Sequence, residues 1–152
     1  TGTHHTTGMI LERLLGMDLG HKTVLDAGCG TGVLGIFCTL KGAKSVWAYD
    51  IDRWSVDNTK ENMLLNGVKN MDASILQGKD AFGLILANIN RNILLADLPS
   101  FVSVMHAGSQ MILSGFYVED IPLLVQKAKS LGLSYLNHTE KENWATLLFE
   151  RL

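Results

Sequence analysis

Three short stretches of the sequence carry residue types that can bind or position a ligand. The first, VLDAGCGTG at residues 24–32, ends an apolar run in Asp26 and continues with glycines at alternate positions. The second, AYDID, contains Asp50, and the third, ANIN, contains Asn88. Glycines that follow a strand let the backbone approach a ligand without a Cβ in the way, so the first stretch is typical of nucleotide-binding sites.

The charge of the first stretch bears on the kind of nucleotide. Residues 30–35 fit the dinucleotide pattern G-x-G-x-x-G, which would hold a pyrophosphate at a helix N-terminus. Asp26 would repel a phosphate there, but it would attract the methionine ammonium of S-adenosylmethionine, directly or through a water. We therefore predict an S-adenosylmethionine site with Asp26, Gly28 and Gly30 as cofactor contacts; a plain strand-to-helix turn is the alternative.

The two other stretches supply a carboxylate and an amide. Asp50 stands where a side chain can accept hydrogen bonds from both ribose hydroxyls, a role that either kind of nucleotide requires, and Asp52 is the better helix cap. Asn88 follows an unbroken apolar run, where an amide is costly unless it is hydrogen-bonded. Its oxygen can accept a hydrogen bond from an amine, so Asn88 is the candidate catalytic residue. The alternatives are that Asn88 only turns the chain and that Asn90 caps the next helix.

Apolar runs and amphipathic segments alternate along the chain and must position these residues. The expected strands cover residues 22–26, 45–50, 73–77, 82–88, 110–114, 134–139 and 144–150, and the expected helices cover 7–17, 32–41, 53–66, 93–105 and 119–131. This alternation predicts an α/β fold with a doubly wound, mostly parallel sheet. Ligands of such sheets bind beyond the carboxyl ends of the strands.

The end of the chain distinguishes two versions of this fold. The turn EKEN between the last two expected strands leaves no room for a crossover helix, so these strands form an antiparallel hairpin. A C-terminal antiparallel strand is typical of class I methyltransferases, which are Rossmann-like, whereas the dinucleotide fold keeps its last strand parallel. The topology therefore favours methyl transfer over hydride transfer.

Composition limits the class of protein further. The 152 residues suit one domain, 1–152, and the formal net charge of −2 provides no basic surface for nucleic acid. No apolar run reaches the ~20 residues of a membrane span, and the two cysteines suggest free thiols, so we expect a soluble, cytoplasmic protein. His4 and His5 are adjacent and lack a third ligand at a suitable spacing, so no metal is expected. The oligomeric state stays open.

Six segments, in order, resemble the catalytic domain of the ribosomal protein L11 methyltransferase (PrmA) family: GTHHTT, VLDAGCGTG, AYDID, LANINRNILL, SGFY and ENWATLLF. The resemblance implies methylation, by S-adenosylmethionine, of lysine side chains and the N-terminal amine of one large-subunit ribosomal protein. It also implies that Thr7, Gly28, Asp50 and Asn88 contact the cofactor and that Asn88 faces the substrate amine. Two alternatives stay open: a class I methyltransferase for another amine, a small molecule or a nucleic acid, and a cofactor-binding module that is inactive without its substrate domain.

The sequence departs from the family pattern in three places. His5 stands where the family commonly has proline. The separate N-terminal domain that recognises the protein substrate in the family has no counterpart here, and the opening TGTHHTTG suggests a fragment. The segment ILQGKDAFGLIL is shorter than the family pattern; either Asp80 contacts the adenine or residues between Gly78 and Lys79 are missing from the sequence, and we favour the second.

Overall fold

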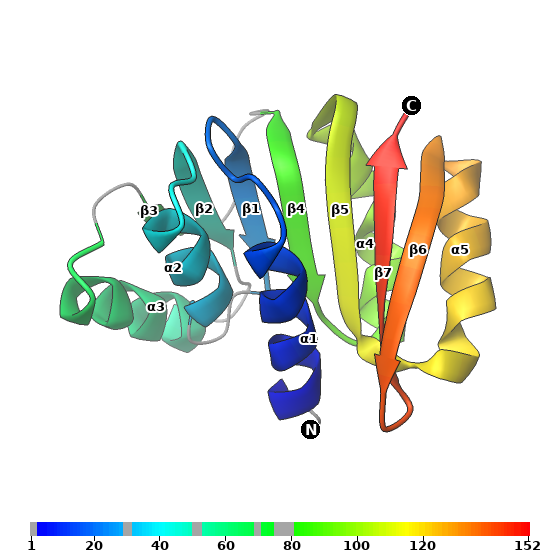
Figure 1. Ribbon diagram of the computed structural model, residues 1–152, viewed down its shortest axis with the longest axis horizontal. Coiled ribbons are helices and arrows are strands. Elements are labelled where there is room, and N and C mark those ends of the chain that lie inside the picture. Colours follow the sequence, from blue (N-terminus) through cyan, green and yellow to red (C-terminus); the bar gives the residue numbers. More distant parts are fainter. Residues whose placement is uncertain (1–2, 29–31, 50–52, 69–70, 75–80) are drawn as a thin grey trace.

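The computed structural model describes residues 3–28, 32–49, 53–68, 71–74 and 81–152, and it shows a seven-stranded sheet with helices on both faces (Figure 1). The strands lie in the order β3-β2-β1-β4-β5-β7-β6. Their bounds are β1 (Thr23–Ala27), β2 (Ser45–Tyr49), β3 (Met71–Ser74), β4 (Phe82–Asn88), β5 (Met105–Tyr117), β6 (Leu133–Lys141) and β7 (Trp144–Arg151).

The sheet is parallel from β3 to β5 and antiparallel at β7. β1 pairs in parallel with β2 and β4, β2 with β3, and β4 with β5. β7 is antiparallel to both β5 and β6. The tight turn before β7 uses Glu142 and Asn143 at φ 49° and 70°, the left-handed conformation that a short hairpin requires. The predicted parallel sheet with a C-terminal antiparallel strand is confirmed.

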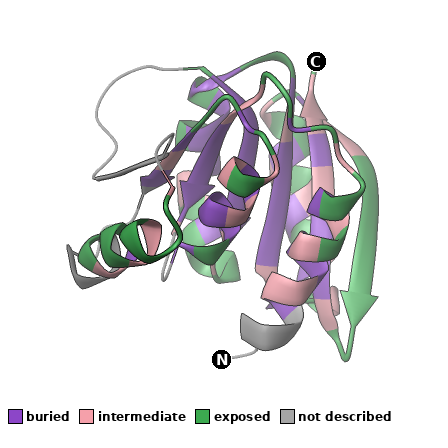
Figure 2. Ribbon diagram, turned by 60° about the vertical axis from the view of Figure 1, so that its left-hand side comes forward, coloured by how far each residue is buried: buried purple, intermediate pink, exposed green. Residues whose placement is uncertain are grey.

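Helices from both halves of the chain cover the sheet. One face carries α1 (Thr3–Leu15), α2 (Val33–Leu40) and α3 (Arg53–Leu65), and the other carries α4 (Arg91–Ser103) and α5 (Ile121–Ser130) (Figure 1). The central strand β4 is buried along all but its last residue, as expected for a parallel strand that is covered on both sides. The edge strand β6 is exposed along most of its length (Figure 2). Strand order reverses between β1 and β4, and this switch point is where such sheets bind ligands.

The elements differ from the sequence-based expectations mainly at their ends. α1 begins at Thr3, earlier than expected, and α4 begins at Arg91 because the Asn90 side chain accepts a hydrogen bond from the Ile93 amide at 3.1 Å. This confirms Asn90 as a helix cap. β5 extends beyond both ends of the expected strand, 110–114. Its pairing with β4 shifts in register between Phe82 and Leu84. The proposed cap Asp52 lies outside the described residues.

Three further findings concern cysteine, membrane and metal. Cys38 is a buried free cysteine, and burial raises the pKa of its thiol to about 12, so the thiol stays protonated at neutral pH. In the described part of the chain, no helix is both long and apolar enough to cross a membrane. The described residues also contain no group of three or more His, Cys, Asp or Glu side chains that could hold a metal ion.

Candidate functional site

Two of the predicted site residues meet at the carboxyl end of β4. Asn88, the last residue of this strand, donates a hydrogen bond from Nδ2 to Thr7 Oγ1 at 3.4 Å. Thr7 lies near the start of α1, 81 positions earlier in the chain, and both residues are half-buried. This hydrogen bond joins the end of β4 to α1.

The next residue, Ile89, is held between two glycines from other parts of the chain. Gly28 follows β1 at φ 70°, and a Cβ added there would lie 2.8 Å from Ile89 Cγ1. Gly115, in β5, has φ 96°, and a Cβ there would lie 2.7 Å from the Ile89 carbonyl oxygen. Ile89 also donates its amide hydrogen to the Ser114 carbonyl at 3.0 Å. The segments around Gly28 and Gly115 therefore both contact Ile89. These contacts fix the backbone directly after Asn88.

Asp26 lies in β1 and is almost completely buried, with 1% of its surface exposed. Its Oδ2 accepts a hydrogen bond from the Gly35 amide, in the first turn of α2, at 3.1 Å. A carboxylate is stabilised at a helix N-terminus because the first amides lack partners within the helix. Asp26 therefore ties α2 to β1, in addition to the cofactor contact that we predict for it.

The remaining predicted site residues cannot be placed relative to these. Gly30, Asp50 and the segment around Gly78, Lys79 and Asp80 lie outside the described residues. Their predicted contacts with S-adenosylmethionine, and the proposed gap in the sequence at that segment, stay predictions.

Sequence reasoning did not find the polar side chains that lie under α1. Ser114 and Thr146 are paired residues of β5 and β7, and both are fully buried. Arg13 of α1 donates from Nε to Thr146 Oγ1 and from Nη1 to Asn137 Oδ1, each at 2.8 Å. Burial lowers the pKa of the Arg13 guanidinium. These contacts hold α1 against the C-terminal strands and so help to position Thr7. Isolated Ser and Thr residues within strands give no sequence signal for them.

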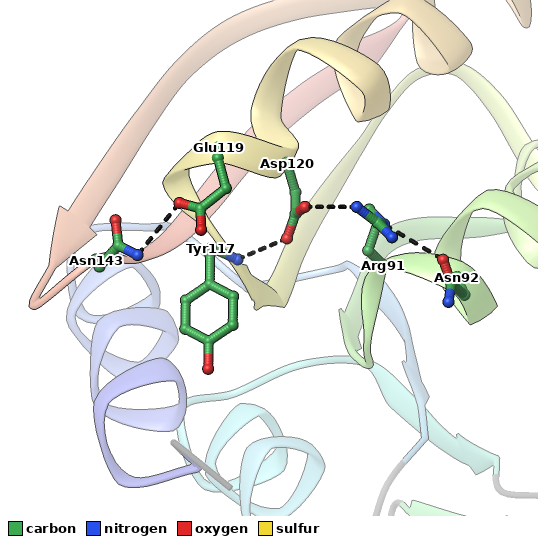
Figure 3. Close-up of polar contacts among 6 residues, drawn as sticks. All are labelled: Arg91, Asn92, Tyr117, Glu119, Asp120 and Asn143. Carbon is green, nitrogen blue, oxygen red and sulfur yellow. Dashed lines mark hydrogen bonds and ion pairs between the residues drawn. The ribbon is translucent and has the colours of Figure 1, made fainter.

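Beyond Asn88, a pocket of about 810 Å³ opens between the ends of β4, β5 and β7. The pocket is lined by residues 90–92, residues 115–117, Asp120 and Trp144. Asp120 accepts hydrogen bonds from Arg91 Nη1 and from the Tyr117 amide, each at 3.0 Å (Figure 3). Sequence reasoning did not identify this pocket, since the pairing of β5 with β7 brings its walls together. The available sequence signal was Tyr117, an aromatic residue that directly follows Gly115 and Phe116.

Comparison with known proteins identifies the family. All 152 residues match the family described as ribosomal protein L11 methyltransferase (PrmA). A protein of Phocaeicola vulgatus named ribosomal protein L11 methyltransferase is 51% identical over 154 residues, which cover 98% of this chain. The chain belongs to the PrmA family. The family resemblance deduced from the sequence motifs is confirmed.

The chain spans about half the length of the relatives it matches, since it covers 55% of the Phocaeicola vulgatus protein. A crystal structure of ribosomal protein L11 methylase from Lactobacillus delbrueckii subsp. bulgaricus is similar at a TM-score of 0.93 and 30% identity, covering 99% of this chain and 80% of that one. Magnesium protoporphyrin IX methyltransferase from Synechocystis PCC 6803, solved with bound SAH, has a TM-score of 0.73 at 16% identity, covering 99% and 83%. The class I methyltransferase fold is thus confirmed.

Proposed function

We propose that this chain is the catalytic part of an S-adenosylmethionine-dependent methyltransferase that acts on lysine side chains and the N-terminal amine of ribosomal protein L11. The observation that supports this proposal most directly is the hydrogen bond between Asn88 and Thr7. It lies beside the contact of Ile89 with Gly28, at the switch point of the sheet in a member of the PrmA family. The names of the relatives support this substrate. Recognition of the whole ribosomal protein by a separate N-terminal domain, and a cytoplasmic location, belong to the same proposal.

The charge of the described residues fits S-adenosylmethionine. The buried Asp26 carboxylate lies two positions before Gly28, where it favours a cation and disfavours a pyrophosphate. Gly28 brings backbone, without a side chain, to the edge beside Ile89. Thr7, Asp26, Gly28 and Asn88 would hold the cofactor together with the two further proposed contacts, Gly30 and Asp50. When bound, S-adenosylmethionine supplies a methyl group that is already activated on a sulfonium.

The role of Asn88 follows from the chemistry of its amide. A lysine amine has a pKa of about 10.4 in water and must lose its proton before its lone pair can attack. An amide is not a base at neutral pH, so Asn88 orients the amine instead of deprotonating it. Its Nδ2 is directed at Thr7, and its oxygen accepts an N–H from the amine. Burial beside a cation lowers the amine pKa, and the proton passes to solvent.

The cofactor assignment is tested by calorimetry with S-adenosylmethionine and NADH. We expect binding of S-adenosylmethionine that weakens in Asp26→Asn, and no binding of NADH. Binding of NADH alone would show that the site is a dinucleotide site, and the proposed function would then be wrong.

The role of Asn88 is tested by single-turnover transfer of a tritiated methyl group to purified L11. Removing one preorganised polar group from a reacting centre typically costs about 10²- to 10³-fold in rate, and we expect a loss of this size for Asn88→Ala. Asn88→Asp should shift the rate profile to higher pH, because a carboxylate stabilises the protonated amine. Asn66→Ala, at an exposed asparagine directly after α3, is the matched control. An unchanged rate in Asn88→Ala would remove this residue from the reaction.

The substrate is tested with the 152-residue chain and with a longer chain that also carries the part of the Phocaeicola vulgatus relative outside the match. We expect both to label L11, the longer one at lower substrate concentration. Labelling of L11 by neither chain, or labelling of ribosomal RNA instead, would contradict the substrate assignment.

A further inference from the structure

We propose that the pocket beyond Asn88 binds the lysine-bearing segment of the protein substrate, with Tyr117 and Trp144 as the platform on which the lysine stem and its cationic neighbours pack. This inference rests on the proposed function. It adds a recognition surface on the catalytic domain itself, distinct from the contacts that hold the cofactor.

The first step is position. The pocket is lined by residues 90–92, which begin two positions after Asn88, and by residues 115–117, which follow the strand partner of Asn88. Gly115 and Ile89 are in close contact, so the two walls meet directly beside the proposed reacting centre. The pocket therefore begins directly after the strand end that carries Asn88.

The second step is the aromatic pair. The rings of Tyr117 and Trp144 stack with centroids 4.3 Å apart and an angle of 30° between their planes. Tyr117 is nonetheless 43% exposed, which is high for an aromatic ring at the end of a central strand. Exposed aromatic faces attract the alkyl stem and the positive charge of lysine and arginine side chains.

The third step is the rigidity of this platform. Two hydrogen bonds fix the backbone at Tyr117: the Tyr117 amide donates to Asp120 Oδ2, and the Val118 amide donates to the Asn143 carbonyl at 2.9 Å. Asn143 Nδ2 also donates to Glu119 Oε2 at 3.2 Å, and the Tyr117 ring extends away from the Asp120 carboxylate (Figure 3). A platform that is ordered in advance binds with a smaller loss of conformational entropy.

The fourth step is charge. Arg91 and Asp120 form an ion pair at 3.0 Å and offset one another, whereas Glu119 beside the platform is paired with the neutral side chain of Asn143. The net charge of these three ionisable groups is therefore negative. A lysine-containing segment is favoured over a phosphate, and a peptide is favoured over RNA.

The test measures binding and catalysis separately for Tyr117→Ala and for Tyr117→Phe, which keeps the ring. Affinity for L11 is measured by calorimetry in the presence of S-adenosylhomocysteine, and KM and kcat are measured in the tritiated-methyl assay. Loss of an aromatic contact with a cation should weaken binding of L11 by about three- to thirtyfold in Tyr117→Ala. We expect a matching rise in KM with kcat and S-adenosylmethionine affinity little changed, and near-normal binding by Tyr117→Phe.

The outcomes separate this inference from the proposed function. Wild-type protein that labels L11, with the same L11 affinity and KM in Tyr117→Ala, would overturn the platform and leave the function standing. Wild-type protein that labels no L11 would overturn the function, and the calorimetry would still decide the platform. A weaker affinity of Tyr117→Ala for a ribosomal RNA oligonucleotide, without any change for L11, would show that the pocket binds RNA and would also overturn the inference.

Discussion

At the scale of single residues, the site depends on how tightly Ile89 is held. Its side chain contacts Gly28 and its backbone contacts Gly115, so it ties the turn after β1 to β5. Asn88 precedes it and cannot turn independently of this contact. The two glycines matter for different reasons: Gly28 leaves room for a side chain, and Gly115 leaves room for backbone.

Gly115→Ala tests this contact. The new Cβ would meet the Ile89 backbone at 2.7 Å, whereas Gly108→Ala, at a similar φ of 86°, would meet nothing within 4 Å. Both variants carry the strain of a left-handed residue, about 1 kcal/mol or more, and only Gly115→Ala adds overpacking of about 1–3 kcal/mol. Urea denaturation should therefore show a clearly larger loss of unfolding free energy for Gly115→Ala. Equal losses in the two variants would mean that the backbone adapts without cost.

At the scale of elements, α4 carries the residues after Asn88 away from the site, and its start is set by one side chain. The Asn90 cap satisfies the Ile93 amide and lets the helix begin directly behind the reacting centre. Arg91 is thereby placed in the first turn, where it reaches Asp120.

Asn90→Ala should lower the free energy of unfolding by about 1 kcal/mol, because one amide at the helix start loses its partner. Asn90→Asp should lower the free energy of unfolding much less, since aspartate is also a good cap. Asn92→Ala, two positions further on and exposed, serves as the control and should change stability by less than about 0.5 kcal/mol. Thermal unfolding followed by circular dichroism measures all three, and equal values for Asn90→Ala and Asn92→Ala would contradict the cap.

Elements and site could be predicted from the sequence to different degrees. β4 was predicted with its observed bounds, because an apolar run between polar residues has no other favourable position than the sheet centre. Asp26, Gly28 and Asn88 stood out because their chemistry is unusual at strand ends. The predicted role of Thr7 came from the family resemblance. Hydrophobic periodicity alone predicts only that a helix begins at this residue. The Tyr117–Trp144 and Arg13–Thr146 contacts depend on β7 lying beside β5, which local spacing does not determine.

At the scale of the whole molecule, the first helix is fastened to the last strand. Thr146 is fully buried and accepts from Arg13 Nε across 133 positions of the chain. Its hydroxyl also bonds to Thr139 of β6. One side chain thus joins α1 to both strands of the terminal hairpin.

Thr146→Val tests this connection. It preserves the shape of the side chain but leaves a buried donor of Arg13 without its partner, which costs about 1–3 kcal/mol. Asn137→Ala removes the other partner of Arg13 at an exposed position and should cost less. We also expect weaker S-adenosylmethionine binding in Thr146→Val, because α1 carries Thr7. A variant with unchanged stability in urea would show that Arg13 finds a replacement partner.

The place of β7 in the sheet also governs the order in which the molecule can be built. β7 follows the other six strands of the described sheet in sequence, yet it lies between β5 and β6, so β6 can join the sheet only through a strand that is made after it. Nascent chains emerge from the ribosome N-terminal end first, at about 5–20 residues per second. Until residues 144–151 arrive, β5 keeps an open edge and Arg13 lacks Thr146. The sheet is therefore completed by the last of its seven strands to be made, and α1 reaches its final contacts only then.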